Sequence, residues 1–264
     1  MRTPAVMAAV LLVCAFDPAA AQSVGATVAC TWSGPPAGDA FPTHRNAVST
    51  PLVADLPYHS ATANELVFLA YTGTDGGSWS SSGSNAAYYA VIRVIDGQTC
   101  QQIDTIHDPA NPLIGAAAPA IGDLDNDGIP EIVALRAMTG VVAFKWNSTL
   151  SRYQTWWVSS GSQINWVNRW DGLSIHDLDG DGYAEVISSG EVFAGRTGLR
   201  LNPNNTVTFP VGVGCSPVIA DVDGDGAVEL VATNIYRWRA GRWQLAYPIN
   251  VSGRHLAVAD FGTP

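Results

Sequence analysis

The stretch Asp123-Leu124-Asp125-Asn126-Asp127-Gly128-Ile129-Pro130-Glu131 places three aspartates at alternating positions and a glutamate at the ninth. The same pattern, Asp-x-Asp-x-Asp-Gly-x-x-Glu, returns twice, and we name the copies loop A (123–131), loop B (177–185) and loop C (221–229). Each loop stands between two short apolar runs, and the second run is rich in aliphatic residues. This order of apolar run, Asp/Gly turn and apolar run is typical of a strand–turn–strand unit.

Two weaker copies flank the three loops. Thr50–Leu56 opens in the same way around Asp55 and reaches Glu65 through a longer, less acidic loop, and Leu256–Gly262 begins a further copy around Asp260. The first aspartates of the five copies are 68, 54, 44 and 39 residues apart. Repeats of about 40 to 50 residues are typical of propeller blades or solenoids.

The other apolar segments also favour β-structure. Strand patterns lie at Tyr89–Ile95, Val141–Trp146 and Trp243–Tyr247, and no segment of 12 or more residues has helical apolar spacing. The sequence therefore predicts an all-β chain that folds as a β-propeller, with about four to five blades visible. Propellers close with about 4 to 8 blades, and the fifth copy here stops within its first loop. We therefore expect an incomplete propeller, truncated from a longer one, with a small closed ring and an open arc as the alternatives.

The acidic loops have the composition of a metal site. Oxygen ligands at loop positions 1, 3 and 5 point inward when a tight loop wraps a cation, and position 7 can offer its carbonyl. Because all these ligands are hard oxygens, Ca²⁺ is favoured over zinc or copper, and Mg²⁺ resists full dehydration. An EF-hand is excluded, since its twelfth position needs Glu and here holds Ala134, Ser188 and Ala232. The alternative is a metal-free turn, but such a turn has no need of three alternating carboxylates.

On these residues the chain resembles the FG-GAP (VCBS-like) repeat family, the calcium-loop blades of integrin α-subunit propellers and of many secreted bacterial proteins. The resemblance extends over about residues 45–264 and implies one Ca²⁺ in each complete loop, about three in all, held between adjacent strands of a blade. The copies at Asp55 and Asp260 lack the inner carboxylates and are not expected to bind a metal. Carried over by position, the implied ligands are Asp123, Asp125, Asp127, the Ile129 carbonyl and Glu131 in loop A, Asp177, Asp179, Asp181, the Tyr183 carbonyl and Glu185 in loop B, and Asp221, Asp223, Asp225, the Ala227 carbonyl and Glu229 in loop C.

The charge distribution agrees with bound cations. After residue 21 the chain has 12 Lys and Arg against 22 Asp and Glu, and loops A to C hold 12 of these acidic residues. Carboxylates that crowd around one point repel each other, and a divalent cation relieves the repulsion. The rest of the chain is nearly balanced in charge and has no basic patch, so nucleic acid is not expected as a partner.

The first residues have the pattern of a secretory signal peptide. Met1–Ala21 begins with a positive charge, continues as an apolar run and ends in three alanines. We expect cleavage after Ala21 and a secreted, extracellular protein, with the periplasm or the cell surface as alternatives. We expect residues 22–49 to form mostly loop and residues 50–264 to form the propeller. No other stretch is long and apolar enough to predict a transmembrane segment.

Three cysteines remain after such a cleavage. They are Cys30, Cys100 and Cys215. An exported chain permits disulfides, and Cys30 with Cys100 is a plausible pair. Spacing alone does not settle the pairing, and buried unpaired thiols fit the sequence equally well.

No catalytic constellation is visible in the sequence. The histidines are scattered, Lys145 is the only lysine, and no nucleophile elbow, zinc-protease motif or phosphate-binding glycine loop occurs. Loops on a rigid scaffold commonly carry recognition. We therefore predict a non-catalytic binding or adhesion module whose partner is an extracellular glycan or protein. Two alternatives stay open, a structural part of a larger exported protein and an enzyme similar to the propeller polysaccharide lyases.

Overall fold

The computed structural model describes residues 27–58, 64–73, 86–137, 139–162, 172–205, 207, 218–251 and 257–259. In these ranges the regular elements are β-strands, apart from one short 3-10 helix, η1 (Ala86–Tyr88). No helix among the described residues has the length and hydrophobicity that a bilayer span requires. The described chain is therefore all-β, as expected.

The strands form four antiparallel sheets that follow the order of the chain. The first sheet contains β1 (Leu52–Ala54), β2 (Glu65–Tyr71), β3 (Tyr89–Asp96), β4 (Gln102–Ile106) and β5 (Leu113–Ile114). The second contains β6 (Ala120–Gly122), β7 (Glu131–Leu135), β8 (Val141–Asn147) and β9 (Arg152–Val158). The third contains β10 (Ser174–His176), β11 (Glu185–Ser188) and β12 (Glu191–Ala194). The fourth contains β13 (Val218–Ala220), β14 (Glu229–Val231), β15 (Ile235–Arg239) and β16 (Arg242–Tyr247).

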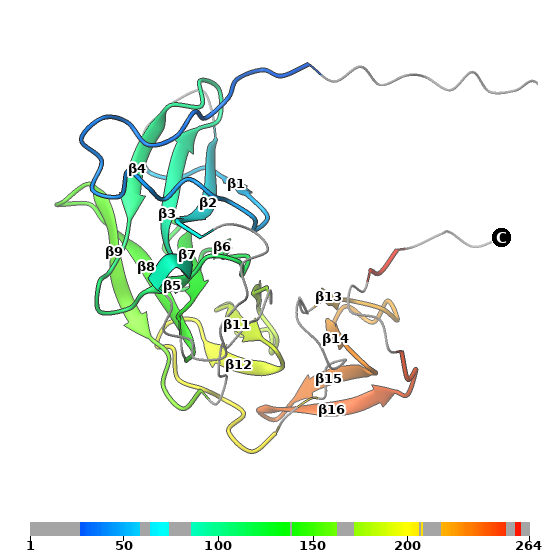
Figure 1. Cartoon of the computed structure of the whole chain (residues 1–264). Coiled ribbons are helices and arrows are strands. Elements are labelled where there is room, and N and C mark those ends of the chain that lie inside the picture. The colour runs from blue at the N-terminus through cyan, green and yellow to red at the C-terminus, as the bar shows by residue number, and fades with distance from the viewer. Residues whose placement is uncertain are drawn as a thin grey trace, which may run out of the picture.

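The four sheets follow one another along an arc (Figure 1). Their first strands are neighbours, since β6 contacts both β1 and β10, and β10 contacts β13. Sheets arranged in this way are the blades of a propeller. Among the described residues the arc stays open between the first and fourth sheets (Figure 1), and the strand contacts that join β1 to β6, β6 to β10 and β10 to β13 have no counterpart between these two sheets. The structure therefore confirms the prediction of an all-β, incomplete propeller.

The acidic loops occupy equivalent places in the sheets. Loops A, B and C connect the first two strands of the second, third and fourth sheets, and the copy at Asp55 connects β1 to β2 in the same way. The three further strands expected from the sequence correspond to β3, β8 and β16. The predicted signal peptide, Asp260 and Cys215 lie outside the described residues.

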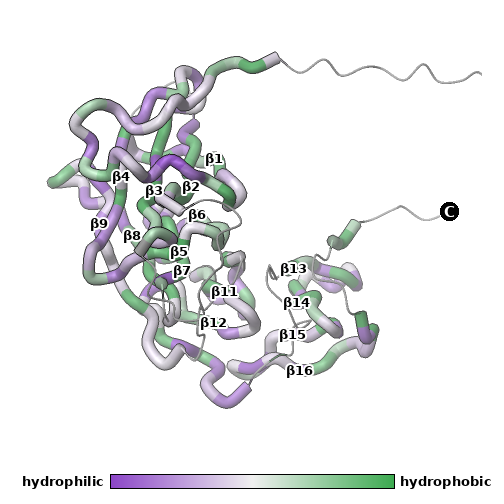
Figure 2. The backbone as a smooth tube through the Cα atoms, in the orientation of Figure 1, coloured by the Kyte–Doolittle hydropathy of each residue, from purple (hydrophilic) through white to green (hydrophobic). Residues whose placement is uncertain are grey.

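Hydrophobic cores lie between neighbouring sheets, because each sheet buries one face against the next. Tyr71 and Phe144 are fully buried in the core shared by the first and second sheets. Trp238 and Trp243 pack edge to face in the core shared by the third and fourth sheets, with ring centroids 5.1 Å apart. Figure 2 shows hydrophobic stretches along many of the strands and hydrophilic stretches in many of the connecting loops.

A glycine permits close contact between the second and third sheets. The indole N–H of Trp157 donates to the carbonyl of Gly195 at 2.7 Å. Gly198 has a φ of +67°, and a Cβ there would lie 2.4 Å from the Trp157 ring. A side chain at position 198 is therefore excluded both by the left-handed backbone and by the indole.

The segment 27–51 lies against the first sheet without forming a strand of its own. A disulfide joins Cys30 to Cys100, the pair that the sequence suggested. The fully buried side chain of Arg93 makes an ion pair of 2.8 Å with Asp39. One covalent link and one buried ion pair thus attach this segment to the sheet.

Candidate metal centre

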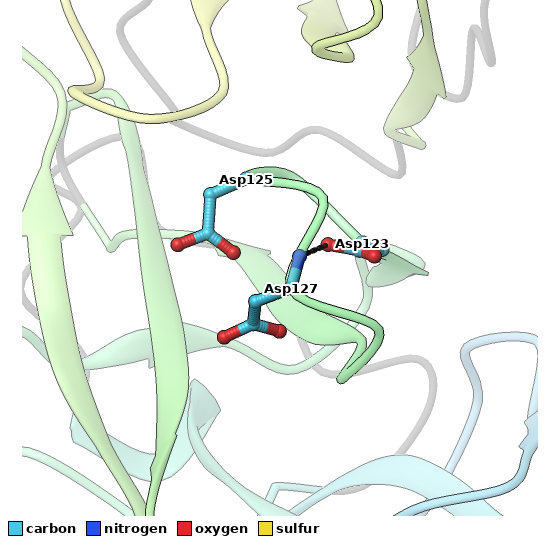
Figure 3. A group of neighbouring side chains, drawn as sticks. All are labelled: Asp123, Asp125 and Asp127. Atoms are coloured by element: carbon cyan, nitrogen blue, oxygen red, sulfur yellow. Dashed lines mark hydrogen bonds between the residues drawn. The ribbon is translucent and has the colours of Figure 1, made fainter.

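Loop A turns because backbone N–H groups fold around its first aspartate. The carboxylate of Asp123 accepts hydrogen bonds from the N–H groups of Asp127 (3.1 Å) and Gly128 (2.8 Å). Figure 3 shows the first of these bonds, with the carboxylates of Asp125 and Asp127 on the same side of the loop. The turn requires left-handed backbone at Asn126 and Gly128, whose φ angles are 62° and 85°.

Loops B and C repeat this turn. Asp177 accepts hydrogen bonds from the N–H groups of Gly180 (2.8 Å) and Gly182 (2.9 Å). Asp221 accepts the corresponding bonds in loop C at 2.7 and 2.9 Å. The four glycines that donate these bonds have φ angles between 75° and 89°. Positions 4 and 6 of the loop therefore favour glycine for the same backbone reason.

The ninth-position glutamate closes each loop from the second strand. Glu131, Glu185 and Glu229 are at most 5% exposed. Oε2 of each accepts a hydrogen bond from the backbone N–H of the second loop residue, at 2.8, 2.9 and 3.1 Å. The turn between β1 and β2 has the same bond, from the N–H of Leu56 to Oε2 of Glu65 at 2.8 Å. We call this hydrogen bond from the second loop residue to the buried glutamate the glutamate clip. The sequence predicted these glutamates as metal ligands, and their structural role was missed. The presence of Glu65 in a copy without the inner aspartates was a signal for that role.

The carboxylates of each loop converge on one point. In every loop, oxygen atoms from three acidic residues lie within 4.8 Å of one another. The groups are Asp123, Asp125 and Asp127 in loop A, Asp177, Asp179 and Glu185 in loop B, and Asp221, Asp223 and Asp225 in loop C. Calcium binds oxygen at 2.3–2.6 Å, so two ligands of one ion are at most about 5 Å apart. The acidic clusters therefore have a spacing that a metal ion can bridge.

Other predicted ligands make a different contact. Oδ1 of Asp181 accepts a hydrogen bond from the N–H of Tyr183 at 2.8 Å. Ile129 and Ala227 donate the equivalent bonds in loops A and C at 2.8 and 2.9 Å. These bonds stiffen the loop after its fifth position. The proposed role of the three position-seven carbonyls as ligands stays a prediction.

A lysine lies against the carboxylate cluster of loop A. Lys145, on β8, places Nζ 2.7 Å from Asp125, 2.7 Å from Asp127 and 3.1 Å from Glu131. Burial lowers the pKa of Lys145, but its hydrogen bonds with the three carboxylates outweigh burial and raise that pKa above its ordinary value. The bond with Lys145 also lowers the pKa of Asp127. Burial raises the pKa of Glu131 in spite of the bonds it accepts.

An arginine takes the equivalent place in loop C. Arg237, on β15, makes ion pairs with Asp223, with Asp225 at 3.3 Å and with Glu229 at 2.8 Å. Arg237 and Glu229 are cross-strand partners, so their side chains share one face of the sheet. The hydroxyl of Tyr247 donates to Asp223 at 2.8 Å, and the guanidinium lies 5.8 Å from the centre of the Tyr247 ring.

The carboxylates of loop B have no such cation. Among the residues that the structure describes, no lysine or arginine lies within 4.0 Å of them. The residue that pairs with Glu185 on β12 is Ala194. Burial, reinforced by the charges of Asp179, Asp181 and Asp177, raises the pKa of Glu185 to about 7. Loop B is thus a convergent carboxylate cluster whose charge no lysine or arginine of the described ranges neutralises.

The comparison with known families agrees with this geometry. Residues 123–188, from loop A to the end of β11, match the model of the FG-GAP-like repeat family. These residues form an FG-GAP-like repeat. The repeat contains loops A and B, and loop C builds the same turn beyond the matched range. No curated protein matches the chain.

Solved structures resemble the chain at low sequence identity. The biofilm matrix protein Bap1 of V. cholerae superposes with a TM-score of 0.52 and 18% identity, over 82% of this chain and 33% of Bap1. Rhamnogalacturonan lyase YesX gives a TM-score of 0.48 with 16% identity, over 76% of this chain and 39% of the lyase. The rhamnogalacturonan lyase PL11 of Bacillus licheniformis gives 0.49 with 15% identity, over 80% and 41%. The chain therefore spans about a third of the length of Bap1, with which it shares a fold.

A hollow of about 630 Å³ opens beside loop B of the FG-GAP-like repeat. Loop B forms one wall, and the end of loop C together with the β15–β16 turn forms the other. Asp177 and Asp179 line the hollow, as do Trp238 and Arg239. Two carboxylates of the uncompensated cluster, one guanidinium and an indole thus border the same space.

Proposed function

We propose that the chain is a secreted, calcium-binding recognition module without catalytic activity, and that it binds an extracellular glycan or protein at the hollow beside loop B. The observation that carries this proposal is the position of Asp177 and Asp179, which belong both to the carboxylate cluster and to the lining of the hollow. Calcium takes six to eight oxygen ligands, and the five residues predicted to bind it in loop B supply five if each gives one oxygen. A ligand oxygen from the hollow can complete such a coordination shell.

The other groups that line the hollow suit a polar ligand. Arg239 is exposed and can form charge-assisted hydrogen bonds with a carboxylate. Trp238 is buried in the core shared by the third and fourth sheets and gives the wall of the hollow a small apolar patch. A uronate-containing glycan has both a carboxylate and apolar ring faces, so it is the ligand class to test first.

Two further observations support an extracellular location. The disulfide between Cys30 and Cys100 suits an oxidising compartment. Bap1, whose fold is similar, is a biofilm matrix protein. Together with the leader-like start of the sequence, they are the basis for proposing secretion.

The function is tested by binding to an array of neutral and uronate-containing glycans, in millimolar calcium and in EDTA. We expect binding that requires calcium and that Arg239→Ala weakens about tenfold, which corresponds to about 1.4 kcal/mol. Arg242→Ala is the matched control, because Arg242 pairs with Arg239 in the hairpin but does not line the hollow. If the wild type binds as well in EDTA as in calcium, and Arg239→Ala binds as well as the wild type, the proposed site is contradicted. Cleavage of the bound glycan contradicts the non-catalytic role.

A further inference from the structure

The residue that faces the glutamate clip across the sheet differs in each of the four sheets. Directly opposed residues have Cβ atoms about 4.5–5.5 Å apart, so a long basic side chain at this position reaches the carboxylate cluster. The cross-strand partners are Asp96 for Glu65, Ala194 for Glu185, and Arg237 for Glu229. Lys145 is at the corresponding position for Glu131, one step beyond the pair of Ile132 and Phe144.

The ammonium of Lys145 lies where a metal ion in loop A would lie. Its distances to Asp125, Asp127 and Glu131 are 2.7, 2.7 and 3.1 Å, close to the 2.3–2.6 Å of a calcium–oxygen bond. Asp125 and Asp127 point to the same side of loop A (Figure 3), and both accept hydrogen bonds from this ammonium. Two cations within a few ångströms of each other repel strongly, so calcium and the ammonium exclude each other from this volume. The donor set of loop A therefore does not fit a calcium ion while Lys145 is in place.

The environment of Lys145 is built to hold a cation. Its Nζ lies 4.9 Å from the centre of the Trp156 ring, on β9, which adds a cation–π contact to the three ion pairs. Lys145 is also the only lysine of the chain.

Loop C repeats the arrangement with different residues. Arg237 reaches Asp223, Asp225 and Glu229 from the third strand of its sheet, as Lys145 does in the second sheet. Tyr247, on the fourth strand, covers the guanidinium as Trp156 covers the ammonium. A cation from the third strand and an aromatic ring from the fourth thus occur in both sheets, which is independent support for a built-in counterion.

We propose that Lys145 and Arg237 are internal counterions that take the place of calcium in loops A and C, so that the chain holds one calcium ion, in loop B. This inference rests on the proposed calcium function and narrows it from about three ions to one. Loops A and C then keep their turns without calcium. The calcium dependence of the chain is confined to the loop that borders the hollow.

The test is the number of calcium ions bound by the full chain, measured by isothermal titration calorimetry. We expect one calcium ion in the wild type and two in either Lys145→Ala or Arg237→Ala. Alanine is chosen because Ala194 is the residue opposite Glu185 in the sheet that contains loop B. The reciprocal variant Ala194→Lys places an ammonium opposite Glu185 and is expected to abolish the remaining site. This variant keeps the proposal testable even if the alanine variants fold poorly.

The outcomes separate the two proposals. Three ions in the wild type, with a count unchanged in Lys145→Ala, overturn the counterion proposal and leave calcium binding intact. Absence of calcium from the wild type and from every variant overturns the proposed calcium function instead.

A second measurement needs no variant. Selective ¹⁵N labelling of the lysine side chain gives a single ammonium signal in the full chain, because there is one lysine. We expect this signal to stay in place while calcium saturates loop B. A shift that follows calcium binding shows that the ion displaces Lys145 from loop A, and it overturns the proposal.

Discussion

The β1–β2 turn and loop B connect equivalent strands of two sheets in different ways. Both have a buried glutamate clip, in which Glu65 accepts a hydrogen bond from Leu56 at 2.8 Å and Glu185 accepts one from Leu178 at 2.9 Å. Loop B adds Asp177, Asp179 and Asp181 to this frame, whereas the β1–β2 turn has no such series. The comparison shows that the clip belongs to the fold and that the aspartates are an addition to it.

The two sheets also differ in what stabilises them. The first sheet has the disulfide of Cys30 with Cys100 and the buried ion pair of Arg93 with Asp39. Loop B instead concentrates negative charge that the described residues do not neutralise. Stability should therefore be independent of calcium in the first sheet and dependent on it in the third.

The largest change in the free energy of unfolding is expected when the buried ion pair of the first sheet is broken. Arg93→Met leaves Asp39 as an uncompensated buried charge and should lower the free energy of unfolding by about 3–5 kcal/mol. The loss should be the same in calcium and in EDTA, as measured by urea unfolding. Arg152→Met, on the exposed start of β9, is the control and should change stability by less than about 0.5 kcal/mol. A calcium-dependent loss in Arg93→Met contradicts the separation of the two regions.

The disulfide should have the next largest effect. Replacing Cys30 and Cys100 with serine removes a cross-link between residues 70 positions apart, which typically costs about 2–4 kcal/mol. The melting temperature should fall, while the number of bound calcium ions should stay the same. If isothermal titration calorimetry finds fewer bound calcium ions in this variant, the first sheet and loop B are coupled and the separation of the two regions is contradicted.

Loop B is tested by Asp179→Asn, which removes a carboxylate from its cluster. Extracellular calcium modules bind with dissociation constants of about 10⁻⁴ to 10⁻³ M, so at millimolar calcium the lost ion is worth about 0.4–1.4 kcal/mol. The variant should be less stable than wild type in calcium but not in EDTA, where it relieves repulsion around Glu185. Asp55→Asn is the matched control at the β1–β2 turn and should not change the calcium response. An equal loss for both variants in calcium counts against loop B as the site.

The two regions should also differ in the pH dependence of stability. The pKa of Glu185 is raised to about 7, above its ordinary 4.5. Between these two pH values the folded chain therefore holds a proton that the unfolded chain has lost. In EDTA this contribution to stability is present below about pH 4.5 and is lost as the pH rises through 7. Melting curves of the wild type should show this fall, and Glu185→Gln, which cannot ionise, should not. A fall of equal size in Glu185→Gln assigns it to another group.

The first sheet should respond in a different pH window. Burial opposes ionisation of Asp39, but hydrogen bonds from Phe41, Arg93, Gln102 and Thr105 lower its pKa to about 2. Its contribution is therefore present above about pH 3.8 and is lost as the pH falls toward 2. Asp39→Asn should flatten that acid limb and leave the limb between pH 4.5 and 7 unchanged.

The sequence by itself determined the features of this protein that depend on local spacing. Alternating carboxylates, glycine at the sixth loop position and short apolar runs on both sides predicted loops A to C and the strands that they join, because a turn and its flanking strands are specified by neighbouring residues. The propeller followed from the recurrence of that unit.

Only the tertiary structure decided which residues surround each loop. Lys145 is 14 residues from Glu131, and Arg237 is 8 from Glu229, so their contacts depend on strand register and not on any motif. The hollow beside loop B likewise joins residues from two sheets. Three loops that look alike in sequence therefore differ in charge, because the neighbouring strand places a lysine, an alanine or an arginine opposite the same glutamate.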